Sequence, residues 1–201
     1  ASYRRQRQMC IRDRYIDVGC HHPFLNNHSY LLYKSGWVGI NIDIDYNSID
    51  MFNFFRKSDV NIQTAVTDHK GEVDLFFYHN RAAKNTISKE FGSDAKEQKK
   101  INSDTLNNII ENSKFKNSKI DFVSIDVEGN EMNVLNGFDL KKYKPKLILL
   151  EFILPNKKEF YEKDINEITN SEVYKFLIKN EYKLINWNHD DLLFMSLDYS
   201  K

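Results

Sequence analysis

Apolar runs separated by turn signals divide the chain into alternating strands and helices. Runs rich in β-branched and aromatic residues predict strands at 14–18, 37–43, 60–66, 72–79, 119–125, 146–152, 181–187 and 192–198. The segments between them predict helices at 24–35, 46–57, 103–112, 130–136 and 169–179. Strands that alternate with helices form right-handed βαβ units. The pattern therefore predicts an α/β fold around a largely parallel sheet.

Two short turns interrupt this alternation. The turn at 68–71 predicts that strands 60–66 and 72–79 pair as a hairpin. The turn at 188–191 joins the last two strands and predicts an antiparallel final strand. Residues 80–100 are polar and poorly periodic, so they are expected to form a loop, either a lid or a solvated connector.

Length and composition narrow the class of protein. A chain of 201 residues most simply forms one domain, and 41% hydrophobic residues argue against disorder. Lys+Arg and Asp+Glu balance at 29 each, so the chain has no net charge that would attract it to nucleic acid or to an anionic membrane. Two cysteines exclude a disulfide framework and a four-cysteine zinc site. With no apolar run long enough for a membrane helix and no signal peptide, the expected location is cytoplasmic.

The first 14 residues differ in composition from the rest of the chain. They hold five of the seven arginines, whereas the remainder uses lysine almost exclusively. One interpretation is a basic arm that binds polyanions. The string RQRQMCIRDR also resembles translated sequencing-adaptor sequence at the ends of assembled environmental genes. We therefore expect 1–14 to be a non-native or disordered head, with the true N-terminus lost, and 15–201 to be a single domain.

A glycine turn follows the first predicted strand. Asp17 ends that strand, and Gly19 permits a tight turn with close backbone approach to a nucleotide-like ligand. The turn is not a dinucleotide fingerprint, because no second glycine follows in G-x-G-x-x-G spacing. Pro23 suits the first turn of the next helix. His21 and His22 lie in this turn and are either incidental or catalytic.

The second predicted strand ends in an acidic residue. Asp43 lies 24 residues after Gly19, and an acid about 20 residues past a glycine turn can accept ribose hydroxyls. The alternative is that Asp43 caps the helix that begins near residue 46. Asp45 is better placed for this cap, and we assign the cap to it.

Three further acids follow buried strands. Asp126 directly follows an apolar strand, where an unpartnered carboxylate would be costly. Glu128 is two residues further, so both can project into one crevice only if the backbone bends at Val127. Glu151 ends the apolar strand KLILLEF and is expected to face the same crevice. The alternatives are a structural network and, for Glu128, the ordinary preference for acids near a helix N-terminus.

Several pieces of the chain, taken together and in order, resemble the FkbM-type S-adenosylmethionine-dependent methyltransferases. They are YIDVGCHHP, SYLLYKSGWVGINIDID, AVTD, AKNTIS, IDFVSIDVEGNEMNVLNGF and KYKPKLILLEF, which cover about 15–155. The resemblance implies the Rossmann-like class I methyltransferase fold, a mostly parallel seven-stranded sheet with an antiparallel last strand. It also implies O-methylation of a hydroxyl on a sugar, glycolipid, polysaccharide or natural product.

The resemblance also implies roles for individual residues. Asp17, Gly19 and Cys20 would surround the methionine part of the cofactor, and Asp43 would hold the ribose. The adenine would be bordered by Ala65, Val66 and Asp68. Asp126 and Glu128 would face the methyl group and the acceptor, which is a small molecule or a glycan. The sequence departs from the family at Pro23, where many members have a second glycine.

Methylation of a hydroxyl requires alignment and removal of a proton. The candidate bases are Asp126, Glu128 and His22. A magnesium ion held by Asp126, Glu128 and Glu151 is an alternative that would acidify the hydroxyl. Two other classes of function remain open. One is a non-catalytic module that binds a nucleoside cofactor, and the other is a nicotinamide-dependent oxidoreductase, for which the glycines are missing.

Overall fold

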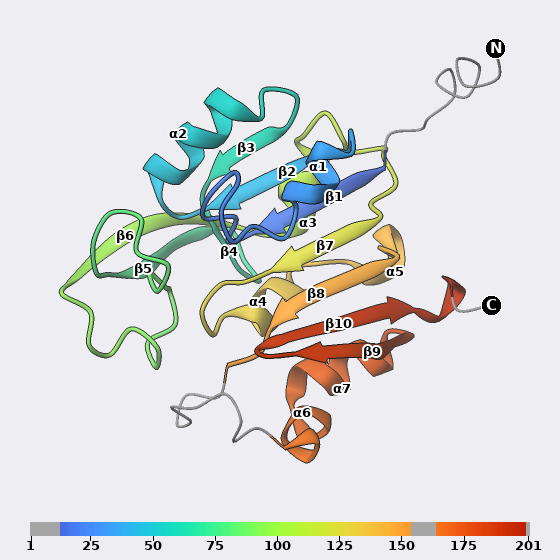
Figure 1. Ribbon diagram of the computed structural model, residues 1–201. Coiled ribbons are helices and arrows are strands. Elements are labelled where there is room, and N and C mark those ends of the chain that lie inside the picture. The colour runs from blue at the N-terminus through green and yellow to red at the C-terminus, as the bar shows by residue number, and fades with distance from the viewer. Residues whose placement is uncertain (1–12, 154–163, 200–201) are drawn as a thin grey trace, which may run out of the picture.

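A seven-stranded sheet forms the centre of the computed structural model, which describes residues 13–153 and 164–199 (Figure 1). Its strands are, in spatial order, β3 (Val60–Gln63), β2 (Val38–Asp43), β1 (Arg14–Val18), β7 (Phe122–Ile125), β8 (Leu147–Glu151), β10 (Asp191–Ser196) and β9 (Tyr182–Asn188). The first five are parallel, and β10 is antiparallel to both of its neighbours. The predicted α/β fold, with its antiparallel last strand, is confirmed.

The core lies on the central strands and the helices packed against them. The helices are α1 (Tyr30–Lys34), α2 (Tyr46–Phe55), α3 (Leu106–Glu111), α4 (Glu131–Asn136), α5 (Leu140–Tyr143), α6 (Ile165–Asn170) and α7 (Glu172–Lys179), with a final 3₁₀ turn at Leu197–Tyr199. Strand β7 is buried along its whole length, and so is β1 after its first residue. Such continuous burial is typical of parallel strands that are covered on both faces.

The predicted hairpin between 60–66 and 72–79 is wrong. The chain leaves the large sheet at Thr64, and a second sheet follows with the order β4 (Ala65–Val66), β6 (Glu97–Asp104) and β5 (Gly71–Phe77). Strand β6 pairs with both others and overlaps the end of the predicted loop and the start of the predicted helix 103–112. Its exposed EQKK run gives no apolar alternation, so the sequence pattern conceals it. Figure 1 shows β5 and β6 on the side toward which the parallel strands point.

The predicted helix 24–35 is reduced to α1, so Pro23 does not begin a helix. The chain between Gly19 and Ser29 is irregular and is held by side chains. The Arg56 guanidinium donates to the Pro23 carbonyl and to the Asn27 side chain. These hydrogen bonds from a distant residue hold the loop in a conformation that local periodicity does not reveal.

The remaining predicted bounds need smaller corrections. The predicted helix 169–179 is divided by Ser171, whose extended backbone ends α6 and whose side chain caps α7. Helix α5 was not predicted. The predicted head up to residue 12 lies outside the described residues, whereas Arg14 belongs to β1 and pairs with Val38.

None of the helices in the described part of the chain is both long enough and apolar enough to cross a membrane.

Candidate functional site

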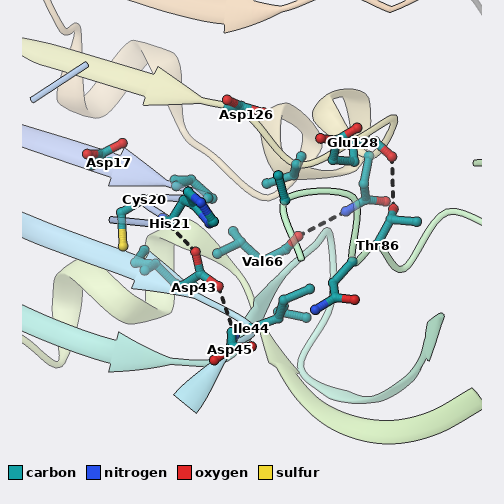
Figure 2. A pocket seen from close by; sticks show the side chains of 18 of the residues that line it. Asp17, Cys20, His21, Asp43, Ile44, Asp45, Val66, Thr86, Asp126 and Glu128 are labelled. Carbon is teal, nitrogen blue, oxygen red and sulfur yellow. Dashed lines mark hydrogen bonds between the residues drawn. The ribbon is translucent and has the colours of Figure 1, made fainter. Parts of the chain in front are cut away.

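A cavity of about 280 Å³ opens at the carboxyl ends of β1, β2 and β7. Its lining comes from residues 17–21, 26–28, 42–45 and 64–66, from most of 81–87 and 126–130, and from Glu151. Figure 2 shows Asp126 and Glu128 on one side of the cavity and Asp43 on the other. The acids that end different strands therefore lie together at one edge of the sheet, as predicted.

The end of β1 supplies a buried carboxylate and a close backbone approach. Asp17 is only 3% exposed and accepts a hydrogen bond of 2.8 Å from Asn27 Nδ2. Gly19 has a φ of +79°, and a Cβ there would lie 1.6 Å from the carbonyl oxygen of Asp126. Only glycine fits at this position, because any side chain would push the ends of β1 and β7 apart.

The end of β2 supplies a second carboxylate, which is held by backbone groups. Asp43 accepts hydrogen bonds of 2.8 Å from the N–H of His21 and from the N–H of Asp45. Burial raises the pKa of Asp43 to about 6, although these two hydrogen bonds oppose the rise. Asp45 is the N-cap of α2, as predicted, and accepts from Asn47 N and Ser48 N. Asp43 is thus free of the capping role and faces the cavity.

The chain reverses direction after β7. The turn occurs at Glu128 and Gly129, with φ values of 53° and 91°, one residue later than the bend predicted at Val127. Glu131 accepts the N–H groups of Val127 and Gly129. Thr86 donates to the Glu128 carbonyl at 2.8 Å, as Figure 2 shows. These contacts stabilise an otherwise unfavourable backbone and direct Glu128 into the cavity.

Three carboxyl groups meet beside this turn. Asp126, Glu128 and Glu151 each place one oxygen within 4.8 Å of the others. Burial, followed by the neighbouring Asp126, raises the pKa of Glu128 to about 7. Burial and the same neighbour also raise the pKa of Glu151 well above its usual value. The group can therefore exchange a proton near neutral pH or hold a divalent cation.

Two predicted site residues lie outside the cavity lining. His22 Nδ1 accepts from the N–H groups of Phe24 and Leu25 and so stabilises the loop. Burial lowers the pKa of His22. The Asp68 side chain is 47% exposed and contacts Thr67 and His69. By contrast, the cavity is lined by Cys20, Ala65 and Val66, as expected, and also by His21, whose role the sequence left open.

The sequence interpretation missed several residues that shape the site. His28 lines the cavity, and its Nδ1 lies 2.9 Å from Ser124 Oγ. Residues 81–87 form a wall, and their only sequence signal was the AKNTIS similarity, to which no role was assigned. A second hollow adjoins the cavity at residues 189–191 and shares Asp126 and Glu151 with it. A second ligand can therefore reach the same carboxyl groups.

The free energy of unfolding is expected to fall as the pH rises from 5 to 8. The pKa of Glu128 is about 7 in the folded protein and 4.5 for the free group, so between these values the folded state holds a proton that the unfolded chain has released. Raising the pH removes that proton and destabilises the fold by about 2 kcal/mol. Glu128→Gln should therefore melt at a higher temperature than the wild type at pH 8, with little difference at pH 4.5. Equal differences at both pH values would contradict this account.

Comparison with known proteins agrees with the geometry of the site. Residues 17–184 match the family model described as Methyltransferase FkbM domain. No curated protein matches the chain. A crystal structure of monomeric WbdD is similar, with a TM-score of 0.45 and 10% sequence identity, and the match covers 92% of this chain and 36% of that one. The family match includes every strand end that builds the cavity. The chain therefore belongs to the FkbM methyltransferase domain family.

Proposed function

We propose that this protein is an S-adenosylmethionine-dependent O-methyltransferase. Its acceptor is a hydroxyl group of a small molecule or glycan, such as a sugar, glycolipid, polysaccharide or natural product. The observation that carries the proposal is one cavity that is lined by Asp17 and Asp43 and, opposite Asp43, by Asp126 and Glu128 (Figure 2). Asp17 and Asp43 suit a nucleoside with a cationic tail, and the carboxyl groups of Asp126, Glu128 and Glu151 suit removal of a proton from the acceptor.

The residues of the cavity suit the parts of this cofactor. Asp43 is oriented by two backbone N–H groups and retains acceptor capacity for ribose hydroxyls. Asp17 offers a negative charge to the ammonium group of the methionine part. Ala65 and Val66 are apolar and suit the adenine ring. The bound cofactor would supply an electrophilic methyl group on a positively charged sulfur.

The chain's own groups would align the acceptor and take its proton. Asp126 and Glu128 line the cavity, and a pKa of about 7 for Glu128 is well matched to general base catalysis at neutral pH. Such a base typically contributes about 10²–10⁴-fold in rate. We leave His22 out of the proposed base set, because it lies outside the cavity lining. The hollow at 189–191 is the proposed route for the acceptor.

Chelation is expected to leave methyl transfer unchanged. Burial raises the pKa of both Asp126 and Glu151, and the charge of Asp126 adds to the rise at Glu151, so the pair is expected to keep a proton rather than present two free charges. Turnover should be compared with and without a chelator, and then with added magnesium. If the chelator abolishes activity and magnesium restores it, Asp126, Glu128 and Glu151 hold a magnesium ion that acidifies the hydroxyl. This role would replace the general base proposed above.

A ligand panel tests the proposal directly. Thermal melts with S-adenosylmethionine, S-adenosylhomocysteine, NAD and NADP should show a shift with the first two only. Transfer of a labelled methyl group from S-adenosylmethionine to a panel of glycosides should then identify an acceptor. A shift with NAD alone would overturn the methyltransferase proposal in favour of an oxidoreductase. Binding of the cofactor without transfer to any acceptor would favour the non-catalytic module.

A further inference from the structure

A buried arginine, Arg56, hydrogen-bonds the loop that lines one side of the cavity. Arg56 follows α2 and is 0% exposed, with its guanidinium carbon 4.8 Å from the Phe52 ring centre and 5.0 Å from that of Tyr33. A buried guanidinium is costly unless its N–H groups find acceptors. Arg56 Nη1 donates to Ser29 Oγ at 2.7 Å and to the Tyr15 hydroxyl at 3.2 Å.

The other guanidinium nitrogen determines the orientation of a cavity-lining amide. Arg56 Nη2 donates to Asn27 Oδ1 at 2.7 Å. Because a guanidinium can only donate, the Asn27 oxygen must face Arg56 and its NH₂ group must face the other way. Asn27 Nδ2 in turn donates to Asp17 Oδ2 at 2.8 Å and to the Cys20 carbonyl at 3.0 Å. A continuous path of hydrogen bonds therefore joins Arg56 to Asp17.

The hydrogen bonds hold the Asp17 carboxylate at one of its two oxygens. Both Asn27 Nδ2 and Ser29 Oγ donate to the same oxygen, Oδ2. Arg56 in turn donates hydrogen bonds to both of these side chains, at Ser29 Oγ and at Asn27 Oδ1. The rotation of the carboxylate is thereby restricted, and Asp17 presents its charge to the cavity, which it lines. A positioned carboxylate binds a cation more tightly than a mobile one, because less conformational entropy is lost on binding.

We propose that Arg56 is a positioning residue for the cofactor's amino-acid part, and that it acts on Asp17 through Asn27 and Ser29. This inference rests on the proposed function, because it requires a ligand with an ammonium group at Asp17. It also gives a reason for the irregular loop between Gly19 and Ser29. The loop places Asn27 and Ser29 within hydrogen-bond distance of the guanidinium.

Calorimetry with two ligands separates this role from a general effect on the fold. S-adenosylhomocysteine carries the amino-acid part, whereas methylthioadenosine has the same nucleoside and sulfur without it. Asn27→Ala should raise the dissociation constant for S-adenosylhomocysteine about tenfold, as expected for a lost hydrogen bond to a charged group. Its affinity for methylthioadenosine should stay within about twofold of the wild type.

Asn61→Ala is the matched control. Asn61 belongs to the same hydrogen-bond network, accepting from Asn41 and donating to the Arg56 carbonyl, but it does not line the cavity. The control should lower the melting temperature and leave both affinities unchanged. Arg56→Lys keeps the charge but not the fork of donors, so it should weaken S-adenosylhomocysteine binding like Asn27→Ala. If Arg56→Lys does not fold, the two affinities measured for Asn27→Ala test the proposal by themselves.

The outcomes distinguish the inference from the proposed function. If the wild type binds neither ligand, the proposed function fails and the inference fails with it. If the wild type binds S-adenosylhomocysteine and Asn27→Ala binds it equally well, only the inference is overturned. An equal loss of affinity for both ligands in Asn27→Ala would show a general disturbance of the loop and would also overturn it.

Discussion

The Asp43→Ala variant is expected to lose most of the rise in melting temperature that S-adenosylhomocysteine gives the wild-type protein. A ligand at 100 times its dissociation constant stabilises a fold by about 2.7 kcal/mol, or about 5–10 °C for a domain of this size. Asp43 is the carboxylate that ends β2 within the cavity, and the backbone N–H groups of His21 and Asp45 orient it toward the proposed ribose. Thermal melts of both proteins with and without the ligand measure the effect.

Asp68→Ala is the control for this experiment. Asp68 was expected from the family resemblance to border the adenine, but the structure places it outside the cavity lining with a half-exposed side chain. Its substitution should leave the ligand shift unchanged. The unliganded Asp43→Ala protein should remain folded, which circular dichroism would show. A full ligand shift in Asp43→Ala would exclude Asp43 as the ribose-binding group.

The Asp126→Asn variant should lower the rate of methyl transfer by at least about 100-fold, the low end for loss of a general base. The substitution keeps the side-chain volume and removes the charge beside Glu128 and Glu151. The affinity for S-adenosylhomocysteine should change far less, because Asp17 and Asp43 are untouched. Single-turnover transfer of a labelled methyl group and calorimetry with S-adenosylhomocysteine measure the two effects separately.

Glu128→Gln distinguishes the two candidate bases. If Glu128 takes the proton, the wild-type rate should rise with pH through about 7, its pKa in the folded protein, and this rise should vanish in the variant. Near-normal turnover in Asp126→Asn would mean that its carboxylate is structural. The base would then be Glu128 or, if the rate of Glu128→Gln is also near normal, another group that lines the cavity, such as His21, His28 or Glu151.

Much of the fold follows from local patterns in the sequence. Apolar runs such as 120–125 are buried on both faces of a parallel sheet, and such strands need no distant information to be recognised. Acids that follow these runs must lie at the carboxyl ends, so Asp17, Asp43 and Asp126 were expected at one crevice. The cap at Asp45 was also predictable, because it depends on residues two and three positions away.

The missed elements depend on contacts between distant residues. Strand β6 is polar because much of it is exposed, and it forms through pairing with β5 and β4 rather than through its own pattern. The irregular loop before α1 depends on Arg56, which lies 29 residues beyond Asn27. The conformation of Glu128 depends on Thr86, 42 residues earlier. Periodicity within a short window contains no signal for any of these contacts.

The sequence by itself therefore determined the strands of the parallel sheet and the edge at which the acids gather, since hydrophobic periodicity and the alternation of strands with helices can be read from short stretches of the chain. Only the tertiary structure decided which of the predicted residues share the cavity. It brought Glu151 to Asp126 and left His22 and Asp68 outside the lining. The physical reason is that the direction of a side chain beyond a strand end is set by packing and hydrogen bonds from other segments, which the spacing of residues along the chain does not specify.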